Sequence, residues 1–260
     1  MPDFIHIERK SDRHLAYVWM DRPPLNVINH QFMDEMIAAH NELAADDDIW
    51  QIILASRSEK FYSNGLDPEL LLSSDVAGRG AVFTRLLDML RVMYAFPKIS
   101  VACIQGHAMA GGAVIGIAAD FRFMGDGKYR YAFSEVPVGL TIPLILLKII
   151  ERTVGPHKLR DVAMLGQAFT PAEAKAIGLV DEVWPERDLY ARTESYLAKL
   201  LPLSQRSLRN VKRNIRAPIV DELEQTTAES LSDLESFLSG NFEEGLRAIL
   251  DRRRPDFQNP

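Results

Sequence analysis

The chain has 260 residues, of which 47% are hydrophobic and 25% are charged, a balance typical of a folded globular protein rather than a disordered one. Lysine and arginine total 30 against 36 aspartates and glutamates, and the resulting net charge of −6 argues against a basic nucleic-acid-binding face. A single cysteine, Cys103, excludes an internal disulfide framework and a cysteine-rich zinc site. Its apolar neighbours predict that it packs in the core.

No stretch reaches the roughly 18 apolar residues that a membrane span requires. The longest candidate, residues 136–150, is interrupted by prolines, a glycine and Lys148. The first ten residues include acidic side chains and lack the apolar segment of a secretory signal. We therefore expect a soluble, cytoplasmic protein with no membrane partner.

Short apolar runs alternate with longer helical patterns along the first half of the chain. The expected elements are a strand at 14–20, a helix at 30–45 capped by Asn29, a strand at 49–55, a loop at 56–68, a helix at 81–96 ended by Pro97, and a buried strand at 99–104.

The second half continues the alternation and then becomes helical. Its expected elements are a glycine- and alanine-rich turn at 106–112, a helix at 113–119, a strand at 120–124, helices at 143–152 and 157–165, a helix from Pro171 to about residue 177 ended by Gly178, a strand at 179–184, and helix from about residue 189 onward. This order predicts an α/β fold with a buried sheet. We expect a core at residues 1–200 and a helical module at residues 201–260 that docks on the core or on another subunit.

Two glycine-containing segments are candidates for holding an anion. In residues 61–67, Gly65 allows the backbone to present the N–H of Leu66, although a plain surface turn is an alternative. In residues 104–113, small residues precede an apolar helix, so that N–H groups at its start can face developing negative charge. Tight packing of helix on sheet is the alternative there. Neither segment has the pattern of a dinucleotide- or phosphate-binding loop.

A third segment, residues 131–140, places Glu135 among apolar side chains. A carboxylate in such surroundings has a raised pKa, which suits it to move protons near neutral pH. The alternative is a solvent-facing glutamate on an amphipathic segment.

Taken in this order, these segments make the sequence similar to the enoyl-CoA hydratase/isomerase superfamily, also called the crotonase family. The similarity runs from about residue 5 to residue 256. Its matching segments are Arg22-Pro23-Pro24-Leu25-Asn26, residues 61–67, Ala110-Gly111-Gly112, Glu135 with Gly139, Pro171-Ala172-Glu173-Ala174, and Gly178-Leu179-Val180-Asp181.

The resemblance implies a right-handed spiral of ββα units followed by C-terminal helices, usually assembled as trimers or dimers of trimers. It also implies an acyl-CoA substrate whose thioester oxygen lies between two backbone N–H groups, those of Leu66 and Gly111. Preorganised donors of this kind stabilise an enolate most strongly in the transition state. No metal and no redox cofactor is implied, because the thioester itself accepts the electrons.

Hydratases of this family use two glutamates, and here the position of the first is Val114, while the second is Glu135. By resemblance this is the pattern of Δ3,Δ2-enoyl-CoA isomerases, in which one carboxylate moves a proton from C2 to C4. Hydration, with Glu69 as the missing carboxylate, is one alternative, and a non-catalytic binding protein is another. The depth of the substrate pocket is expected to depend on Leu140, Ile142, Met89 and Met93.

Other polar residues have simpler interpretations. Asp67 is expected to cap the following helix, and His107 to form a structural hydrogen bond. Candidates to meet CoA phosphates are Arg22, Lys60 and residues 252–254. No cluster of histidine and acidic residues has the spacing of a metal site.

Overall fold

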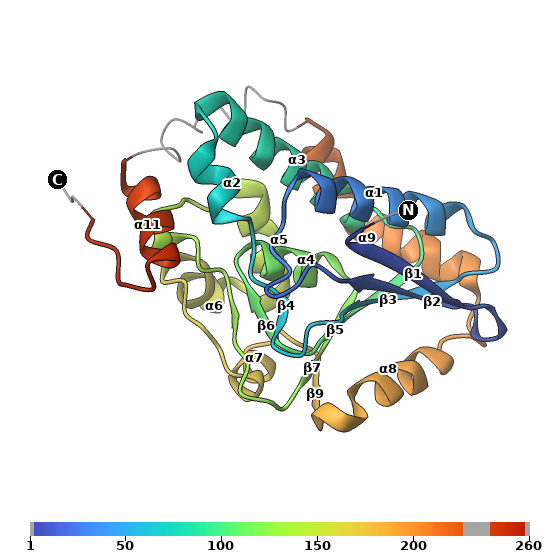
Figure 1. The fold of residues 1–260 in the computed structure, drawn as a ribbon. Coiled ribbons are helices and arrows are strands. Elements are labelled where there is room, and N and C mark those ends of the chain that lie inside the picture. The colour runs from blue at the N-terminus through green and yellow to red at the C-terminus, as the bar shows by residue number, and fades with distance from the viewer. Residues whose placement is uncertain (1–2, 226–239, 258–260) are drawn as a thin grey trace.

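The computed structural model describes residues 3–225 and 240–257, in which strands and helices alternate as expected of an α/β protein (Figure 1). The strands are β1 (Ile5–Lys10), β2 (Leu15–Met20), β3 (Gln51–Ser56), β4 (Phe61–Ser63), β5 (Ile99–Ile104), β6 (His107–Met109), β7 (Phe121–Gly125), β8 (Tyr131–Ala132) and β9 (Glu182–Trp184). The helices are α1 (His30–Ala45), α2 (Pro68–Ser73), α3 (Val76–Tyr94), α4 (Gly111–Ala118), α5 (Leu144–Val154), α6 (Pro156–Leu159), α7 (Pro171–Ala176), α8 (Leu189–Ala198), α9 (Gln205–Gln225) and α11 (Gly240–Leu250).

The main sheet has six strands in the order β1-β2-β3-β5-β7-β9. Only β1 runs antiparallel to its neighbour, and the other pairs are parallel. Both faces are covered, with α8 on one side and α1 and α9 on the other (Figure 1). Along β2, Ala16 and Val18 join the larger core, while Leu15 and Tyr17 pack with residues of α8. This two-sided burial explains why the strands are nearly continuous apolar runs.

A second, smaller sheet consists of β4, β6 and β8, which pair in parallel. The sequence patterns did not predict this sheet, and residues 56–68 and 106–112, expected as a loop and a turn, contain β4 and β6. Its strands have only two or three residues, too few to show a periodic pattern. Because parallel strands end at the same edge of a sheet, the segments that follow β4, β6 and β8 are brought together.

Several longer elements match their predictions. Helix α1 has the expected bounds, and the side chain of Asn29 caps it by accepting a hydrogen bond from the N–H of Phe32 (2.9 Å). Strand β5 also has its expected bounds.

Other elements were not expected or have bounds that differ from the prediction. Strand β1 was not expected, α3 begins five residues before the predicted helix, and β9 begins only at Glu182, because Gly178 (φ +76°) turns the chain after α7. The helix expected at 157–165 is α6 followed by a π-helical turn, Arg160–Met164.

The described helices beyond residue 200, α9 and α11, pack on the rest of the chain, and residues 226–239 of the helix expected there lie outside the described residues. Ile219 and Leu223 of α9 and Phe242 and Leu246 of α11 belong to the larger apolar core. The buried carboxylate of Asp120 pairs with Lys212 (2.7 Å) and Arg216 (2.9 Å) of α9. The division at residue 200 stays a prediction. Within the described residues, no helix is both long and apolar enough to span a membrane.

Candidate active site

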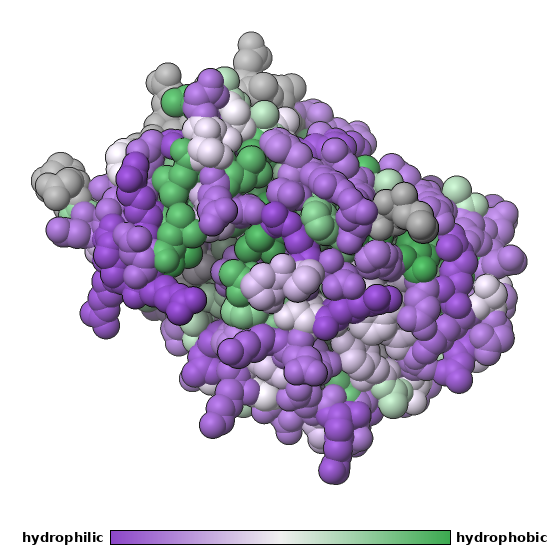
Figure 2. Space-filling view, in the orientation of Figure 1, coloured by the Kyte–Doolittle hydropathy of each residue, from purple (hydrophilic) through white to green (hydrophobic). Residues whose placement is uncertain are grey.

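The three candidate segments meet at one edge of the small sheet. Residues 64–66 follow β4, Ala110 and Gly111 follow β6, and Glu135 follows β8 by three residues. Residues from all three segments line one cavity of about 330 Å³. Figure 2 shows hydrophobic side chains gathered where α2 and α11 face each other, beside this cavity.

The backbone around Leu66 leaves its N–H free. The N–H of Ile28 donates to the carbonyl of Gly65 (2.8 Å), and the N–H of Asp67 donates to the carbonyl of Ile28 (3.0 Å). In extended chain, successive N–H groups point to opposite sides. The N–H of Leu66 therefore faces away from Ile28, and it has no hydrogen-bond partner in the part of the chain that the structure describes.

The second free N–H belongs to Gly111, the first residue of α4. The first N–H groups of a helix have no acceptor within the helix, and that of Gly111 has none among residues 3–225 and 240–257. Ala110 precedes it with φ +46°, a conformation that costs a non-glycine residue about 1–3 kcal/mol and is found at functional sites. The Ala110 N–H donates to the carbonyl of Ala132 (2.8 Å), which holds this conformation.

The two loops lie in direct contact. A Cβ atom added to Gly111 would lie 3.4 Å from the nitrogen of Leu66. A Cβ atom on Gly112 would lie only 2.1 Å from the carbonyl oxygen of Ser63, so this residue must be glycine for α4 to rest on β4. The two unpartnered N–H groups are therefore neighbours on the cavity wall, an arrangement suited to one oxygen that carries negative charge.

Glu135 lies at the start of a 3-10 turn, Val136–Val138, and is 9% exposed. Its Oε2 atom is buried and has no hydrogen-bond partner among the described residues. Loss of hydration raises the pKa of the Glu135 carboxyl to about 7, because burial disfavours the charged form. The residue is therefore not the solvent-facing glutamate of the alternative interpretation, and its proton affinity suits a group that takes up and releases protons near neutral pH.

The other predicted pocket residues divide into two groups. Val114 and Leu140 line the cavity, and Glu135 is the only titratable side chain among its described lining residues. Ile142 was predicted to line it and does not. It is 4% exposed in the core, while its neighbours Thr141 and Pro143 face the cavity.

Met89 and Met93, also expected to set the depth of the pocket, are instead buried in the core behind the cavity. Four other residues of the same helix, Phe83, Leu86, Leu87 and Leu90, line the cavity. From sequence alone, the cavity-facing and core-facing sides of an apolar helix look the same.

The alternative acidic and basic candidates have structural contacts. Asp67 caps α2 as expected, accepting a hydrogen bond from the N–H of Glu69 (3.1 Å), and it pairs with Arg22 (2.9 Å). Glu69 itself is exposed and does not line the cavity. His107 accepts the expected hydrogen bond from the N–H of Arg130 (3.2 Å), and partial burial lowers its pKa.

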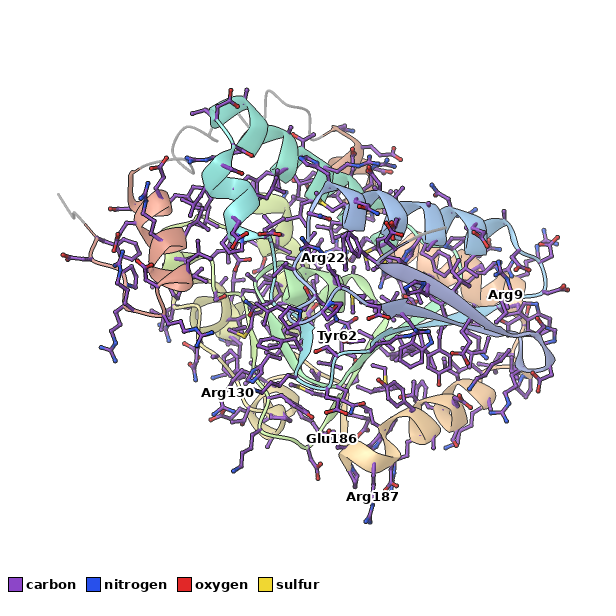
Figure 3. All side chains as sticks on the ribbon, viewed as in Figure 1. Arg9, Arg22, Tyr62, Arg130, Glu186 and Arg187 are labelled. Atoms are coloured by element: carbon purple, nitrogen blue, oxygen red, sulfur yellow. The ribbon has the colours of Figure 1, made fainter. Side chains whose placement is uncertain are left out.

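None of the candidates for CoA phosphates lines the cavity. In the view of Figure 3, Arg22 projects near the middle of the picture, whereas Arg130 and Arg187 lie toward its lower margin. Lys60 is exposed, and Arg253 pairs with Glu244. No group of histidine, cysteine and acidic side chains within the described residues is arranged to hold a metal ion.

Three polar residues of the cavity were not predicted: Asn64, Ser134 and Thr141. Ser134 and Thr141 are adjacent in the sequence to Glu135 and Leu140, and Asn64 is two residues from Leu66. Their proximity to predicted residues was the available signal. The leucines from α2, α5 and α11 that complete the wall gave no signal, because their positions depend on tertiary packing.

Comparisons with known proteins agree with this geometry. The family model described as enoyl-CoA hydratase/isomerase matches residues 10–260. Enoyl-CoA delta isomerase 1, mitochondrial, from Rattus norvegicus is 26% identical over 248 residues, which cover 95% of this chain and 86% of that protein. A probable enoyl-CoA hydratase, echA17, from Mycolicibacterium paratuberculosis is 30% identical over 230 residues, 88% of this chain and 89% of its own.

Among solved structures, human mitochondrial delta3-delta2-enoyl-CoA isomerase superposes with a TM-score of 0.92 at 23% identity. The alignment covers 96% of this chain and 98% of that one. The fold expected from the sequence, the crotonase-like α/β fold, is thereby confirmed. Because the family model spans nearly the whole sequence, the chain belongs to the enoyl-CoA hydratase/isomerase family.

Proposed function

We propose that this protein is a Δ3,Δ2-enoyl-CoA isomerase, which moves the double bond of a 3-enoyl-CoA to the 2 position. The observation that carries the proposal is that one carboxylate, Glu135, with a pKa of about 7, is the single titratable side chain among the described residues of a mainly apolar cavity and lies beside two unpartnered N–H groups.

The reaction needs one proton carrier. The Glu135 carboxylate removes a proton from C2, and the electrons of that C–H bond move onto the thioester oxygen as an enolate. The N–H groups of Leu66 and Gly111 donate hydrogen bonds to this oxygen. Electrons then return from the oxygen to restore the C1–O double bond, the C2–C3 double bond forms, and the C3–C4 double bond opens as its electrons take the proton that Glu135 delivers to C4.

This cycle restores the enzyme and needs no metal and no redox cofactor. Each step uses the same carboxyl group, first as a base and then as an acid. A group with a pKa near neutrality performs both steps well, because neither protonation state is strongly disfavoured.

Hydration is the second candidate, since curated relatives at 30% identity carry the name of probable hydratases. Addition of water requires polar groups that hold and activate it. Val114 offers none, and Glu69 is exposed and away from the cavity. These two features favour isomerisation.

The test is a product analysis in H₂¹⁸O with 3-hexenoyl-CoA and crotonyl-CoA side by side. We expect the 2-enoyl-CoA product from the first substrate and little ¹⁸O in any hydroxyacyl product. Incorporation of ¹⁸O faster than double-bond migration would identify the protein as a hydratase. Failure to bind any acyl-CoA would point to a non-catalytic member of the family.

We also propose, from the family resemblance, that the chain assembles as a homotrimer or a dimer of trimers. The cytoplasmic location expected from the sequence is likewise a proposal.

A further inference from the structure

The cavity extends from Glu135 into a wall built from four helices. Its side chains include Leu71 of α2, Phe83 and Leu87 of α3, Leu146 of α5, and Leu246 and Ile249 of α11. These side chains carry no hydrogen-bonding group, so ordered water in this part of the cavity would lack partners.

Polar side chains in the cavity are confined to the segments near Glu135. Those among the described lining residues are Asn64, Ser134 and Thr141, together with Glu135 itself. The cavity therefore has a polar end where the reaction is proposed to occur and a hydrocarbon end between the helices. A linear ligand with a charged or polar head and an apolar tail matches this division.

The volume of the cavity limits the length of the acyl tail that it can hold. A methylene group takes about the space of a water molecule, about 30 Å³, so that 330 Å³ holds on the order of ten such groups. A four-carbon acyl group would leave most of the hydrocarbon end empty.

We propose that the preferred substrates are straight-chain acyl thioesters of about eight to twelve carbons, and that Arg79 is a positioning residue that holds α11 against this tail. The proposal rests on the proposed function, since it names the substrate class of the same cavity.

Arg79 lies directly behind the hydrocarbon wall and is 5% exposed. Its Nε donates a hydrogen bond to the carbonyl oxygen of Leu71 (2.8 Å), and its Nη2 donates to Glu243 Oε1 (2.7 Å). Its guanidinium also lies 5.7 Å from the centre of the Phe242 ring. One buried side chain on α3 thus connects α2 and α11, and all three helices line the cavity.

A second contact fixes α11 near Glu135. A Cβ atom on Gly245 would lie 2.0 Å from the carbonyl oxygen of Val138, so α11 packs at backbone distance on the 3-10 turn that begins after Glu135. With this contact and the Arg79–Glu243 pair in place, Leu246 and Ile249 keep a fixed distance from α3. Weakening the Arg79–Glu243 ion pair should therefore weaken binding of the acyl tail and leave binding of the thioester head unchanged.

The first experiment measures the affinity of saturated acyl-CoAs from four to sixteen carbons by isothermal titration calorimetry. Each methylene that enters an apolar cavity contributes about 0.8 kcal/mol, so we expect Kd to fall about fourfold per carbon. Kd should stop falling near ten to twelve carbons, because the cavity is then full. A Kd that does not depend on chain length, or that stops falling at four to six carbons, would overturn the proposal.

A variant with a larger side chain in the wall tests which part of the cavity limits the length of the acyl chain. Leu87→Trp should move the chain length at which Kd stops falling to shorter chains, and it should weaken decanoyl-CoA binding more than butyryl-CoA binding. Val76→Trp, on an exposed position of the same helix, is the matched control and should not move it. An identical profile for both variants would contradict the assignment of the tail to this wall.

Arg79→Met removes the donors and keeps the length of the side chain. We expect decanoyl-CoA binding to weaken about tenfold and butyryl-CoA binding less than twofold. Arg85→Met changes a more exposed arginine of the same helix and serves as the control. If Arg79→Met does not fold, Glu243→Gln tests the same pair from α11. Equal weakening for both ligands would show a merely structural role.

These measurements use unreactive ligands, so they separate the two proposals. A length-dependent Kd without any isomerisation would overturn only the proposed function. Isomerisation with a Kd independent of chain length would overturn only the proposed substrate class.

Discussion

The hydroxyl of Tyr131 donates a hydrogen bond of 2.7 Å to the carbonyl oxygen of Ala113. Tyr131 belongs to β8, the strand before Glu135, and Ala113 lies in the first turn of α4, which begins with Gly111. The close approach requires Gly116, where a Cβ atom would lie 2.7 Å from the same hydroxyl oxygen. This buried contact connects the carboxylate of the candidate site to one of its N–H donors.

Tyr131→Phe should therefore affect both stability and turnover. The change removes this hydrogen bond while the carbonyl keeps its place in the helix, at a cost of about 0.5–1.5 kcal/mol in the free energy of unfolding. We expect a lower kcat, because α4 and β8 are no longer held at a fixed separation. Urea unfolding and steady-state kinetics measure the two effects. Tyr190→Phe, which alters a weak contact of 3.4 Å on α8, should leave kcat unchanged.

Glu135→Gln should abolish isomerisation while acyl-CoA binding persists. Glutamine keeps the shape of the side chain and cannot take up the proton. General acid–base groups contribute about 10²–10⁴-fold to rates, and a sole proton carrier should reach the upper end of this range. Turnover is followed with 3-hexenoyl-CoA, and binding by calorimetry with a saturated acyl-CoA. Turnover near that of the unmodified protein would refute the assignment of Glu135.

The pKa of Glu135 also links activity to stability. The base must be ionised in the free enzyme, so kcat/KM should rise with pH through about 7 and then level off. Stability has the opposite dependence. The folded state holds this proton up to about pH 7, whereas the unfolded chain loses it near 4.5, so burial of Glu135 lowers stability as pH rises between these values.

The same argument predicts that Glu135→Gln is more stable than the unmodified protein at pH 8, by at most about 3 kcal/mol. The difference should disappear near pH 4. Thermal unfolding across this range measures it. Equal stability of the two proteins at pH 8 would show that the carboxylate is better solvated than its surroundings indicate.

Gly111→Pro should remove turnover by deleting one N–H group. Proline is well tolerated at the first position of a helix, where the N–H has no acceptor within the helix. Loss of one donor to an oxyanion lowers kcat by about 10²–10³-fold. Circular dichroism must show that the fold is intact. An intact variant with full activity would exclude this N–H from the reaction.

Light scattering tests the proposed assembly. We expect a mass of three or six chains at micromolar concentration, in keeping with the family resemblance. A stable monomer would contradict this expectation.

Local sequence patterns predicted which segments meet at the candidate site, but they did not predict the small sheet that brings these segments together. The apolar neighbours of Glu135 indicated a buried carboxylate, and the small residues around Gly111 indicated a helix start open to an anion. Both signals are local. The small sheet of β4, β6 and β8 was missed because its hydrogen bonds join residues far apart in the chain.

The error at Ile142 has a similar origin. The residue lies in an irregular segment, where no helical or strand period determines which side chain faces the cavity. Its neighbours Thr141 and Pro143 do face it. Such directions depend on how α5 packs, which one sequence does not reveal.

The small parallel sheet and the four-helix wall come from different parts of the fold. Reacting groups are held by backbone pairing among β4, β6 and β8, whereas the hydrocarbon end is shaped by side chains of α2, α3, α5 and α11. Exchanging leucines for larger or smaller residues on those helices would leave the strand pairing intact. Under the proposed function, substitutions on these helices would change which acyl chains bind without moving Glu135 or the N–H groups of Leu66 and Gly111.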